Sequence, residues 1–266
     1  MGADIKSLRI RIRSVDSTLH LTRAMGLVAS SKIRRATRSM ARSREYTAAL
    51  EEVVDVLRAS QDCAKSPYLR GGAGRTKLIV IAGDRGLAGG YNANVFRLAD
   101  AQENADILPI GKRACERYGE GYTSSERFSA SDASKVAEEQ CEAFLAGEFA
   151  SLEILYTRYV SMMTQEARIL RVLPLERGGK TDGAAPIFEP DERTVLDAAV
   201  PVYVSGLLAA CVRESFASEV AARRMAMDSA GKNAQEMIDS LQLQYNRARQ
   251  NSITQEITEI VAGSGL

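Results

Sequence analysis

Residues 5–40, IKSLRIRIRSVDSTLHLTRAMGLVASSKIRRATRSM, decide the fold, because their apolar and small residues recur at alternating steps of three and four. This spacing is a heptad seam, and it predicts a helix that packs along its length against another helix. The first proline is Pro67, so we expect one helix from about residue 3 to 58, roughly 80 Å long. The seam residues are Ile5, Leu8, Ile12, Val15, Leu19, Thr22, Gly26, Ala29, Ile33, Ala36 and Met40.

The C-terminal end of the chain repeats this spacing. The last proline is Pro201, so a second helix is expected from about residue 205 to 262, ended by Gly263, Ser264 and Gly265. Two long helices at opposite ends of one chain predict an antiparallel coiled coil. A helical bundle would need further long heptad segments, and the sequence has none. The C-terminal seam residues are Met227, Gly231, Ala234, Ile238, Leu241, Tyr245, Ala248 and Ser252.

Between the two helices, the sequence predicts a small α/β domain with a largely parallel, Rossmann-like sheet. Stretches rich in glycine and proline, 66–75 and 178–186, connect this domain to the helices. We therefore divide the chain into an N-terminal coiled-coil helix, a central domain and a C-terminal helix that pairs with the first, at 1–60, 76–176 and 203–262. Strands are expected at 77–82, 106–110, 151–160 and 167–175, and helices at 92–105, 112–118 and 131–149, the last with an N-cap serine.

Composition excludes several classes of protein. The 266 residues are 45% hydrophobic and 26% charged, with a net charge of +1. No run approaches the roughly 20 apolar residues of a membrane span, so no transmembrane segment is expected. The basic N-terminus lacks the apolar core of a secretory signal, and its pattern continues too far to favour a cleaved leader. The four cysteines are scattered and His20 is the one histidine, so neither a metal site nor a catalytic histidine set is expected.

The turn after the first expected strand reads Gly83-Asp-Arg-Gly-Leu-Ala-Gly-Gly-Tyr-Asn92. A glycine-rich turn between a strand and a helix is where a Rossmann-like unit holds a phosphate. Its spacing matches neither G-x-G-x-x-G nor a Walker loop. The favoured interpretation is a tight structural turn in which Asp84 and Arg85 pair or face a partner. A nucleotide-dependent enzyme stays open as the alternative.

The expected N-terminal helix is strongly basic. Residues 1–44 carry eleven Lys and Arg side chains against Asp4 and Asp16. Such a stripe suits an acidic protein surface or a nucleic acid. Without interleaved aromatic residues or a nucleic-acid motif, a protein surface is favoured and no nucleic-acid partner is expected.

The C-terminal helix ends in a polar run, Arg247-Ala-Arg-Gln-Asn-Ser-Ile-Thr-Gln-Glu256. Gln250 and Thr254 are one turn apart and share a helix face. The run is either an ordinary solvated helix end or a surface that a collar of other subunits grips through breakable hydrogen bonds.

Five segments, in order along nearly the whole chain, resemble the gamma subunit of F-type ATP synthase. Thr22–Ala36 is similar to that family's first-helix signature, and Gly83–Asn92 to its central-domain turn. Tyr156–Glu166 is similar to the strand before its second linker. The most specific matches are Ala217-Ser-Glu-Val-Ala-Ala-Arg-Arg-Met-Ala-Met-Asp228 and Leu241–Ile260.

The resemblance implies a non-catalytic rotor shaft that couples transmembrane proton flow to ATP synthesis and hydrolysis. The shaft would turn inside a ring of three alpha and three beta subunits and regulate its activity. The α/β domain would lie beside the epsilon subunit and the membrane c-ring. No cofactor is implied. The residues do not distinguish protons from sodium ions.

Individual positions also carry implied roles. By this resemblance, four residues correspond to family positions that contact the beta-subunit catch loops: Arg249, Gln250, Thr254 and Glu256. Four others correspond to the part of the shaft that faces the acidic beta-subunit lever: Met25, Lys32, Arg34 and Arg35. Tyr203 matches the foot that approaches the membrane ring.

The chain departs from the family pattern at a few positions. Leu19, His20 and Leu21 stand where basic or amide residues are usual, and Gly26 replaces a larger residue, which puts the local stiffness of the shaft in question. We expect a peripheral protein on the cytoplasmic face of a bacterial plasma membrane. A nucleic-acid-binding coiled-coil protein is the remaining alternative, and it would show salt-dependent binding through the basic stripe.

Overall fold

The computed structural model describes residues 2–72, 74–178 and 187–264, and it divides into two compact units. One unit joins residues 1–29 to 224–266, and the other comprises residues 30–223. The predicted connection at 178–186 lies, apart from Gly178, outside the described residues. Each unit is described by itself below.

Two long helices, α1 and α5, contribute residues to both units. Helix α1 spans Gly2–Ala59 and α5 spans Glu192–Ser264. Every predicted seam residue on both helices is buried or half-buried, which confirms the heptad prediction along its whole length.

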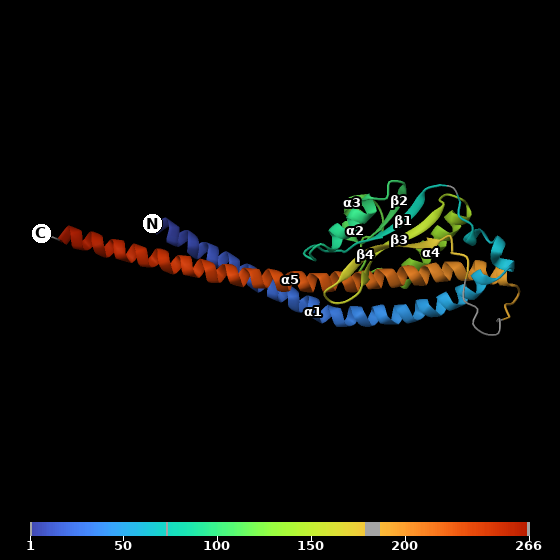
Figure 1. The fold of residues 1–266 in the computed structure, drawn as a ribbon, viewed down its shortest axis with the longest axis horizontal. Helices are drawn as coiled ribbons and strands as arrows, with labels where there is room; N and C mark the ends of the chain where they lie inside the picture. Colours follow the sequence, from blue (N-terminus) through green and yellow to red (C-terminus); the bar gives the residue numbers. More distant parts are fainter. Residues whose placement is uncertain (1, 73, 179–186, 265–266) are drawn as a thin grey trace. The chain divides into compact units, whose positions relative to one another are not determined.

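In the unit formed by residues 1–29 and 224–266, the two helices run antiparallel. The Arg9 guanidinium donates to the Tyr245 hydroxyl at 2.8 Å, and Arg23 donates to the Gln235 side chain at 3.3 Å. Leu19, Ala234 and Ile238 form a narrow apolar core between the helices. The helix ends are drawn in blue and red in Figure 1.

The unit formed by residues 30–223 contains a four-stranded sheet in the order β2-β1-β3-β4. Strands β1, β2 and β3 are parallel, and β4 is antiparallel to β3, which confirms the largely parallel sheet. The strands are β1 (Thr76–Ile81), β2 (Ala105–Ile110), β3 (Ser151–Tyr159) and β4 (Gln165–Leu173). The shorter helices are α2 (Tyr91–Asp100), α3 (Lys112–Tyr118), α4 (Ala130–Leu145), η1 (Asp62–Lys65) and η2 (Pro67–Leu69).

The sheet is the middle of three layers, as Figure 1 shows. On one face, Leu78, Val80 and Leu155 pack against residues of α2 and α3. On the other face, Ile79 and Ile154 join a larger core with α4 and α5. Successive strand residues therefore point to opposite layers, as the pleat requires.

Helix α5 begins well before the predicted start at about residue 205, because it runs through Pro201. An internal proline costs about 3 kcal/mol, since it removes a backbone hydrogen bond. Leu196, Val200, Val204 and Leu208 on the same helix have no solvent exposure. Burial of one such side chain contributes about 1.5–3 kcal/mol, so together they outweigh the proline. At its other end α5 continues through Gly263 to Ser264 rather than stopping before it.

The N-cap serine of α4 is Ser129, two residues before the predicted start of the helix. Its hydroxyl accepts from the Asp132 backbone N–H at 3.1 Å, and the Asp132 carboxylate accepts from the Ser129 backbone N–H at 2.8 Å. This capping box satisfies donors that the first turn of a helix leaves unpaired.

Within the described residues, α5 alone is long and apolar enough by composition to cross a membrane, with a mean hydropathy of 1.9 over its most apolar window. Half of that window is buried inside the protein. Core helices pass the same test, and the fully buried Leu196, Val200, Val204 and Leu208 of α5 belong to the core that α4 and α5 form with the sheet.

Candidate functional site

The glycine-rich turn after β1 is folded back on itself and onto α5. The Gly83 backbone N–H donates to the Asn92 side-chain oxygen at 3.0 Å, and the Tyr91 hydroxyl donates to the Ser215 carbonyl at 3.1 Å. A Cβ atom at Gly83 would lie 2.7 Å from the carboxyl carbon of Glu219. Glycine is therefore needed here for close approach of the turn to α5.

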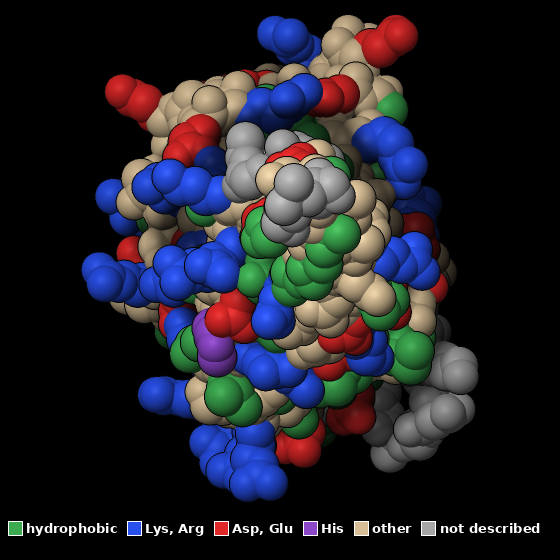
Figure 2. All heavy atoms as spheres, turned by 90° about the vertical axis from the view of Figure 1, so that its left-hand side faces the viewer, with side chains coloured by type: hydrophobic (Ala, Val, Ile, Leu, Met, Phe, Trp, Pro, Cys, Tyr) green, Lys and Arg blue, Asp and Glu red, His purple; other side chains and the backbone are tan. Residues whose placement is uncertain are grey.

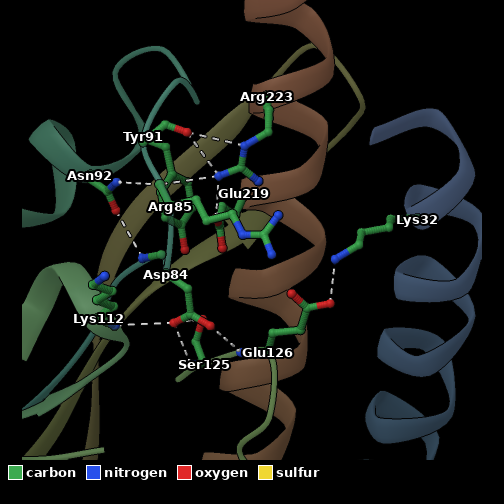
Figure 3. A network of polar contacts seen from close by, with 12 residues as sticks. Lys32, Asp84, Arg85, Tyr91, Asn92, Lys112, Ser125, Glu126, Glu219 and Arg223 are labelled. Atoms are coloured by element: carbon green, nitrogen blue, oxygen red, sulfur yellow. Dashed lines mark hydrogen bonds and ion pairs between the residues drawn. The ribbon is translucent and has the colours of Figure 1, made fainter. Parts of the chain in front are cut away.

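Glu219 and Arg223 of α5 fill the inside of this turn (Figure 3). The Arg223 guanidinium donates to the Arg85 and Gly86 carbonyls at 3.2 and 3.3 Å, and also to the Glu219 carboxylate. Glu219 is 3% exposed, and its burial raises its pKa although Arg223 acts in the opposite direction. The buried Glu219 carboxylate lies against Gly83, so the side of the turn that faces α5 is filled by protein and has no room for a phosphate.

Asp84 anchors the other side of the turn. Its carboxylate accepts from the Ser124 hydroxyl at 2.6 Å, from the Ser125 and Glu126 backbone N–H groups at 2.7 and 3.2 Å, and from that of Lys112 at 3.2 Å. Burial by itself would raise the pKa of Asp84, but these donors hold it below its ordinary value. The predicted alternatives for Asp84 were pairing with Arg85 or facing a partner, and its observed partners are these serine and backbone donors.

Polar side chains of α5 also complete an open edge of the sheet. Pairing of β1 with β3 ends at Leu155, so the later residues of β3 lack a strand neighbour on that side. The Thr157 backbone N–H donates to the Ser215 hydroxyl, and the Ser218 hydroxyl donates to the Thr157 carbonyl, both at 3.0 Å. The Tyr159 backbone N–H donates to Glu214 at 2.9 Å. We call Glu214, Ser215, Ser218, Glu219 and Arg223 the α5 clamp.

The clamp extends to α1 through one ion pair. The Arg44 guanidinium lies 2.6 Å from the Glu214 carboxylate, which is itself 10% exposed. Both long helices are thereby fixed to the α/β layers within residues 30–223, α5 through largely buried side chains and α1 through Arg44, which is 48% exposed. From the sequence alone, the clamp residues had no predicted role. Their signal was a row of polar residues in the otherwise apolar run from Val204 to Ala221.

The residues matched to the catch loops lie near the end of α5. Arg249, Gln250, Thr254 and Glu256 are all exposed. The Ser252 hydroxyl donates to the Glu256 carboxylate at 3.3 Å. The side chains of the other three make no hydrogen bond or ion pair with the part of the chain that the structure describes.

The residues matched to the lever-facing part of the shaft are spread around α1. Met25 is half-buried, whereas Arg34 and Arg35 are exposed. Lys32 reaches from α1 to the Glu126 carboxylate at 2.5 Å, as Figure 3 shows. The structure therefore does not bring these four side chains to one common face.

Tyr203 is half-buried and packs against the core below the sheet. Its burial, followed by the nearby Glu51 carboxylate, raises its pKa to about 12.

Basic side chains are prominent on the surface. The face drawn in Figure 2 carries more Lys and Arg side chains than Asp and Glu side chains. His20 is exposed and lies 3.7 Å from Asp16. Within the ranges that the structure describes, no three His, Cys, Asp or Glu side chains group as metal ligands would.

An antiparallel helix pair whose helices are clamped to an α/β domain is the architecture of a stalk-type subunit. Comparison with known proteins agrees with this class. The family described as ATP synthase matches residues 4–265. The ATP synthase gamma chain of Ruminococcus albus is 40% identical and that of Alkaliphilus metalliredigens 38%, over 98% and 99% of both chains. The "ATP synthase gamma chain, sodium ion specific" of Acetobacterium woodii is 36% identical over 99% of both chains.

The chain belongs to the family of ATP synthase gamma chains. A gamma chain is a non-catalytic subunit of that membrane-associated complex, and these relatives are bacterial. Solved structures agree on the fold. A chain of the Euglena gracilis mitochondrial ATP synthase in rotational state 3 superposes with a TM-score of 0.69 at 18% identity, over 99% of this chain and 94% of that one. A chain of the rotor of the same enzyme in rotational state 1 has a TM-score of 0.67 at 19% identity, over 95% and 100%.

Proposed function

We propose that this chain is the rotating central shaft of an F-type ATP synthase. It turns inside a ring of three alpha and three beta subunits, couples transmembrane ion flow to ATP synthesis and hydrolysis, and regulates the activity of the ring. The observation that carries the proposal is the buried or half-buried setting of every seam residue of α1 and α5 in a member of the gamma-chain family. Packing at each turn of the seam resists bending and twisting of one helix against the other.

The clamp supports the transmission of torque. Rotation of the foot reaches the shaft only if the helices cannot slip against the α/β domain. Slippage of α5 would break the bonds from Arg223 to the turn and from Ser218 to β3. Loss of such bonds leaves buried donors and acceptors unpaired, which is costly and opposes slippage.

The catalytic ring would be gripped through the exposed end of α5. Arg249, Gln250 and Thr254 are free to bond with the beta-subunit catch loops, and Glu256 adds a carboxylate. Such contacts shift the nucleotide affinity of a beta subunit only if they differ between its states. Side chains with unused donors and acceptors at one helix end suit bonds that break and reform as the shaft turns.

The acidic lever of the beta subunit would meet the basic part of α1. Arg34 and Arg35 are exposed and carry this contact best, because Lys32 is already paired with Glu126 and Met25 is half-buried. Exposed guanidinium groups speed association with an acidic surface more than they add affinity.

The foot would face the epsilon subunit and the membrane c-ring, on the cytoplasmic face of a bacterial plasma membrane. Tyr203 is half-buried, so its role near the ring is to hold the local surface in place, and its neighbour Val202 is exposed at 48%. Neither nucleic acid nor a cofactor has a part in this function.

The proposal is tested in the complete complex that carries the double variant Arg249→Ala with Gln250→Ala. Loss of charge-assisted bonds of about 1.5–3 kcal/mol should slow ATP hydrolysis by roughly tenfold or more. The matched control is Arg247→Ala, an exposed arginine on the same helix, which should retain the parent rate. Equal rates for all three complexes would contradict the assigned contact, and native purification of the chain without alpha and beta subunits would contradict the function itself.

A further inference from the structure

A basic cavity lies within residues 30–223, and none of the residues proposed to contact the catch loops lines it. Its volume is about 870 Å³, and its walls come from α1, α5, the turn after β1, the start of α3 and the segment 123–128. Figure 3 shows part of these walls, with Lys32 on α1 opposite Asp84, Lys112 and Glu126. Six cationic side chains line it: Lys32, Arg35, Arg85, Lys112, Arg127 and Arg213.

Most of this positive charge has no counterion in the protein. The two carboxylates in the lining are Glu126 and Asp84. Glu126 is paired with Lys32, and the Asp84 carboxylate is held by serine and backbone donors rather than by a cation. The side chains of the other five cations make no hydrogen bond or ion pair within the described parts of the chain.

Arg213 is the most informative of these five. It is half-buried on α5, whereas the other four are exposed. Its neighbour Glu214 is already engaged by Arg44 and the Tyr159 backbone. A partly desolvated guanidinium that has no carboxylate partner is unfavourable unless a bound anion neutralises its charge and accepts its hydrogen bonds.

The remaining lining fits a compact phosphate-bearing ligand. Guanidinium and ammonium groups match phosphate oxygens, and the Thr123 and Ser124 hydroxyls add short polar groups. Phe128 and Phe216 supply aromatic surface. The volume lies in the range of about 300–1,000 Å³ that is usual for small-molecule sites. Cations from separate elements surround one volume instead of following one face, which favours a small polyanion over an extended acidic peptide.

We propose that this cavity is a binding site for a small polyphosphate anion, such as a pyrophosphate, a triphosphate or a nucleotide that carries one. The site is separate from the inside of the glycine-rich turn, which Glu219 fills. A ligand here would bridge α1, α5 and the α/β layers, so its binding would stabilise residues 30–223 against unfolding by mass action.

The test measures binding of inorganic pyrophosphate, tripolyphosphate and ATP to the full chain by calorimetry, and their effect on its melting temperature. Arg213→Gln and Lys112→Gln should each weaken pyrophosphate binding at least tenfold. Arg34→Gln and Arg38→Gln remove exposed charges of α1 that do not line the cavity, and they should leave the affinity within about twofold, as expected for a specific site. Helix content by circular dichroism checks that each variant is folded. If Arg213→Gln does not fold, Lys112→Gln still tests the site, because Lys112 is exposed.

Equal affinity for tripolyphosphate and ATP would support recognition of phosphate alone, and tighter binding of ATP would support added contacts to the base. Absence of pyrophosphate binding, or equal weakening by Arg34→Gln and Arg213→Gln, would overturn the site. Displacement of pyrophosphate by a poly-glutamate peptide at lower concentration would overturn it in favour of an acidic polypeptide. Because Arg213 and Lys112 have no part in the proposed subunit contacts, these outcomes are independent of the rotor function.

Discussion

The same two helices are held in different ways in the two units. In residues 30–223, α5 buries Leu196, Val200, Val204 and Leu208 completely, and its polar clamp grips the turn after β1 and the edge of β3. In residues 1–29 and 224–266, α5 pairs with α1, and its seam residues range from 4% exposed at Leu241 to half-buried at Tyr245. One helix is thus an anchor in one unit and half of a two-helix coiled coil in the other.

This difference explains how a stiff shaft coexists with exposed working surfaces. A seam of one residue per turn needs little of the helix circumference, so the rest of it stays available to other subunits. In the anchored part, no residue of α5 from Tyr203 to Arg223 is exposed, because the helix packs against both α1 and the α/β layers.

The largest effect should follow from Arg223→Met. The variant leaves the Glu219 carboxylate buried without its partner, and loss of one partner of a buried pair costs about 3–5 kcal/mol. Lys232→Met on the same helix is the matched control, because Lys232 pairs with Asp228 at 3.0 Å but is 73% exposed. The control should lose less than about 0.5 kcal/mol. Urea unfolding followed by circular dichroism measures both, and equal losses would contradict the anchor.

Leucine truncation compares the two units directly. Leu208→Ala opens a cavity in a core packed on all sides and should lower the free energy of unfolding by about 3 kcal/mol. Leu241→Ala, in the two-helix seam, should cost about 2 kcal/mol, because two helices can close partly over the gap. Thermal unfolding of the full chain reports both losses. A larger loss of stability in Leu241→Ala than in Leu208→Ala would contradict the denser packing around Leu208.

Substitution of glycine by alanine should change stability in opposite directions at Gly26 of the coiled coil and at Gly83 of the turn. At Gly26 the new Cβ would lie 3.1 Å from the flexible end of Arg224, which can move, and alanine favours a helix by about 1 kcal/mol. We expect Gly26→Ala to stabilise the coiled coil slightly. Gly83→Ala should cost about 1–3 kcal/mol, because its Cβ meets the buried Glu219 carboxylate. Melting temperatures that change in the same direction would contradict the prediction.

The smallest effect concerns pH. The folded-state pKa of Asp84 lies below its ordinary value of 3.8. Its contribution to stability is therefore present above about pH 4 and is lost as the pH falls through the lower, folded-state pKa. Asp84→Asn should reduce the fall in melting temperature between pH 7 and pH 2. Ser125→Ala should do so partly, because it removes the hydroxyl that donates to the Asp84 carboxylate at 3.2 Å. An unchanged fall in melting temperature between pH 7 and pH 2 in both variants would show that these bonds do not cause that fall.

Much of the helical framework could be predicted, because a seam at steps of three and four requires only local periodicity. Pro201 misled the prediction of the start of α5, since a rule about one backbone bond cannot weigh burial supplied by residues far away in the chain. The clamp was missed for a related reason. Glu219 and Arg223 are one turn apart, which is ordinary on a helix surface, and only the fold puts that surface against the turn at Gly83.

The settings of some candidate contact residues also follow from the sequence, and those of others do not. The exposed setting of Arg249 follows from its place outside the seam, whereas the pairing of Lys32 with Glu126 joins segments with no local relation. The cations of the basic cavity come from separate stretches of the chain and form a set only after folding.

The open edge of β3 has a consequence for biosynthesis. The strand ends at Tyr159, but the residues that cap its edge lie on α5, after Asp191, and leave the ribosome much later. An unpaired strand edge is a template for association with other chains. Until Ser215 and Ser218 arrive, the nascent sheet exposes that edge, so chaperone binding during translation should be strongest between the emergence of β3 and that of α5.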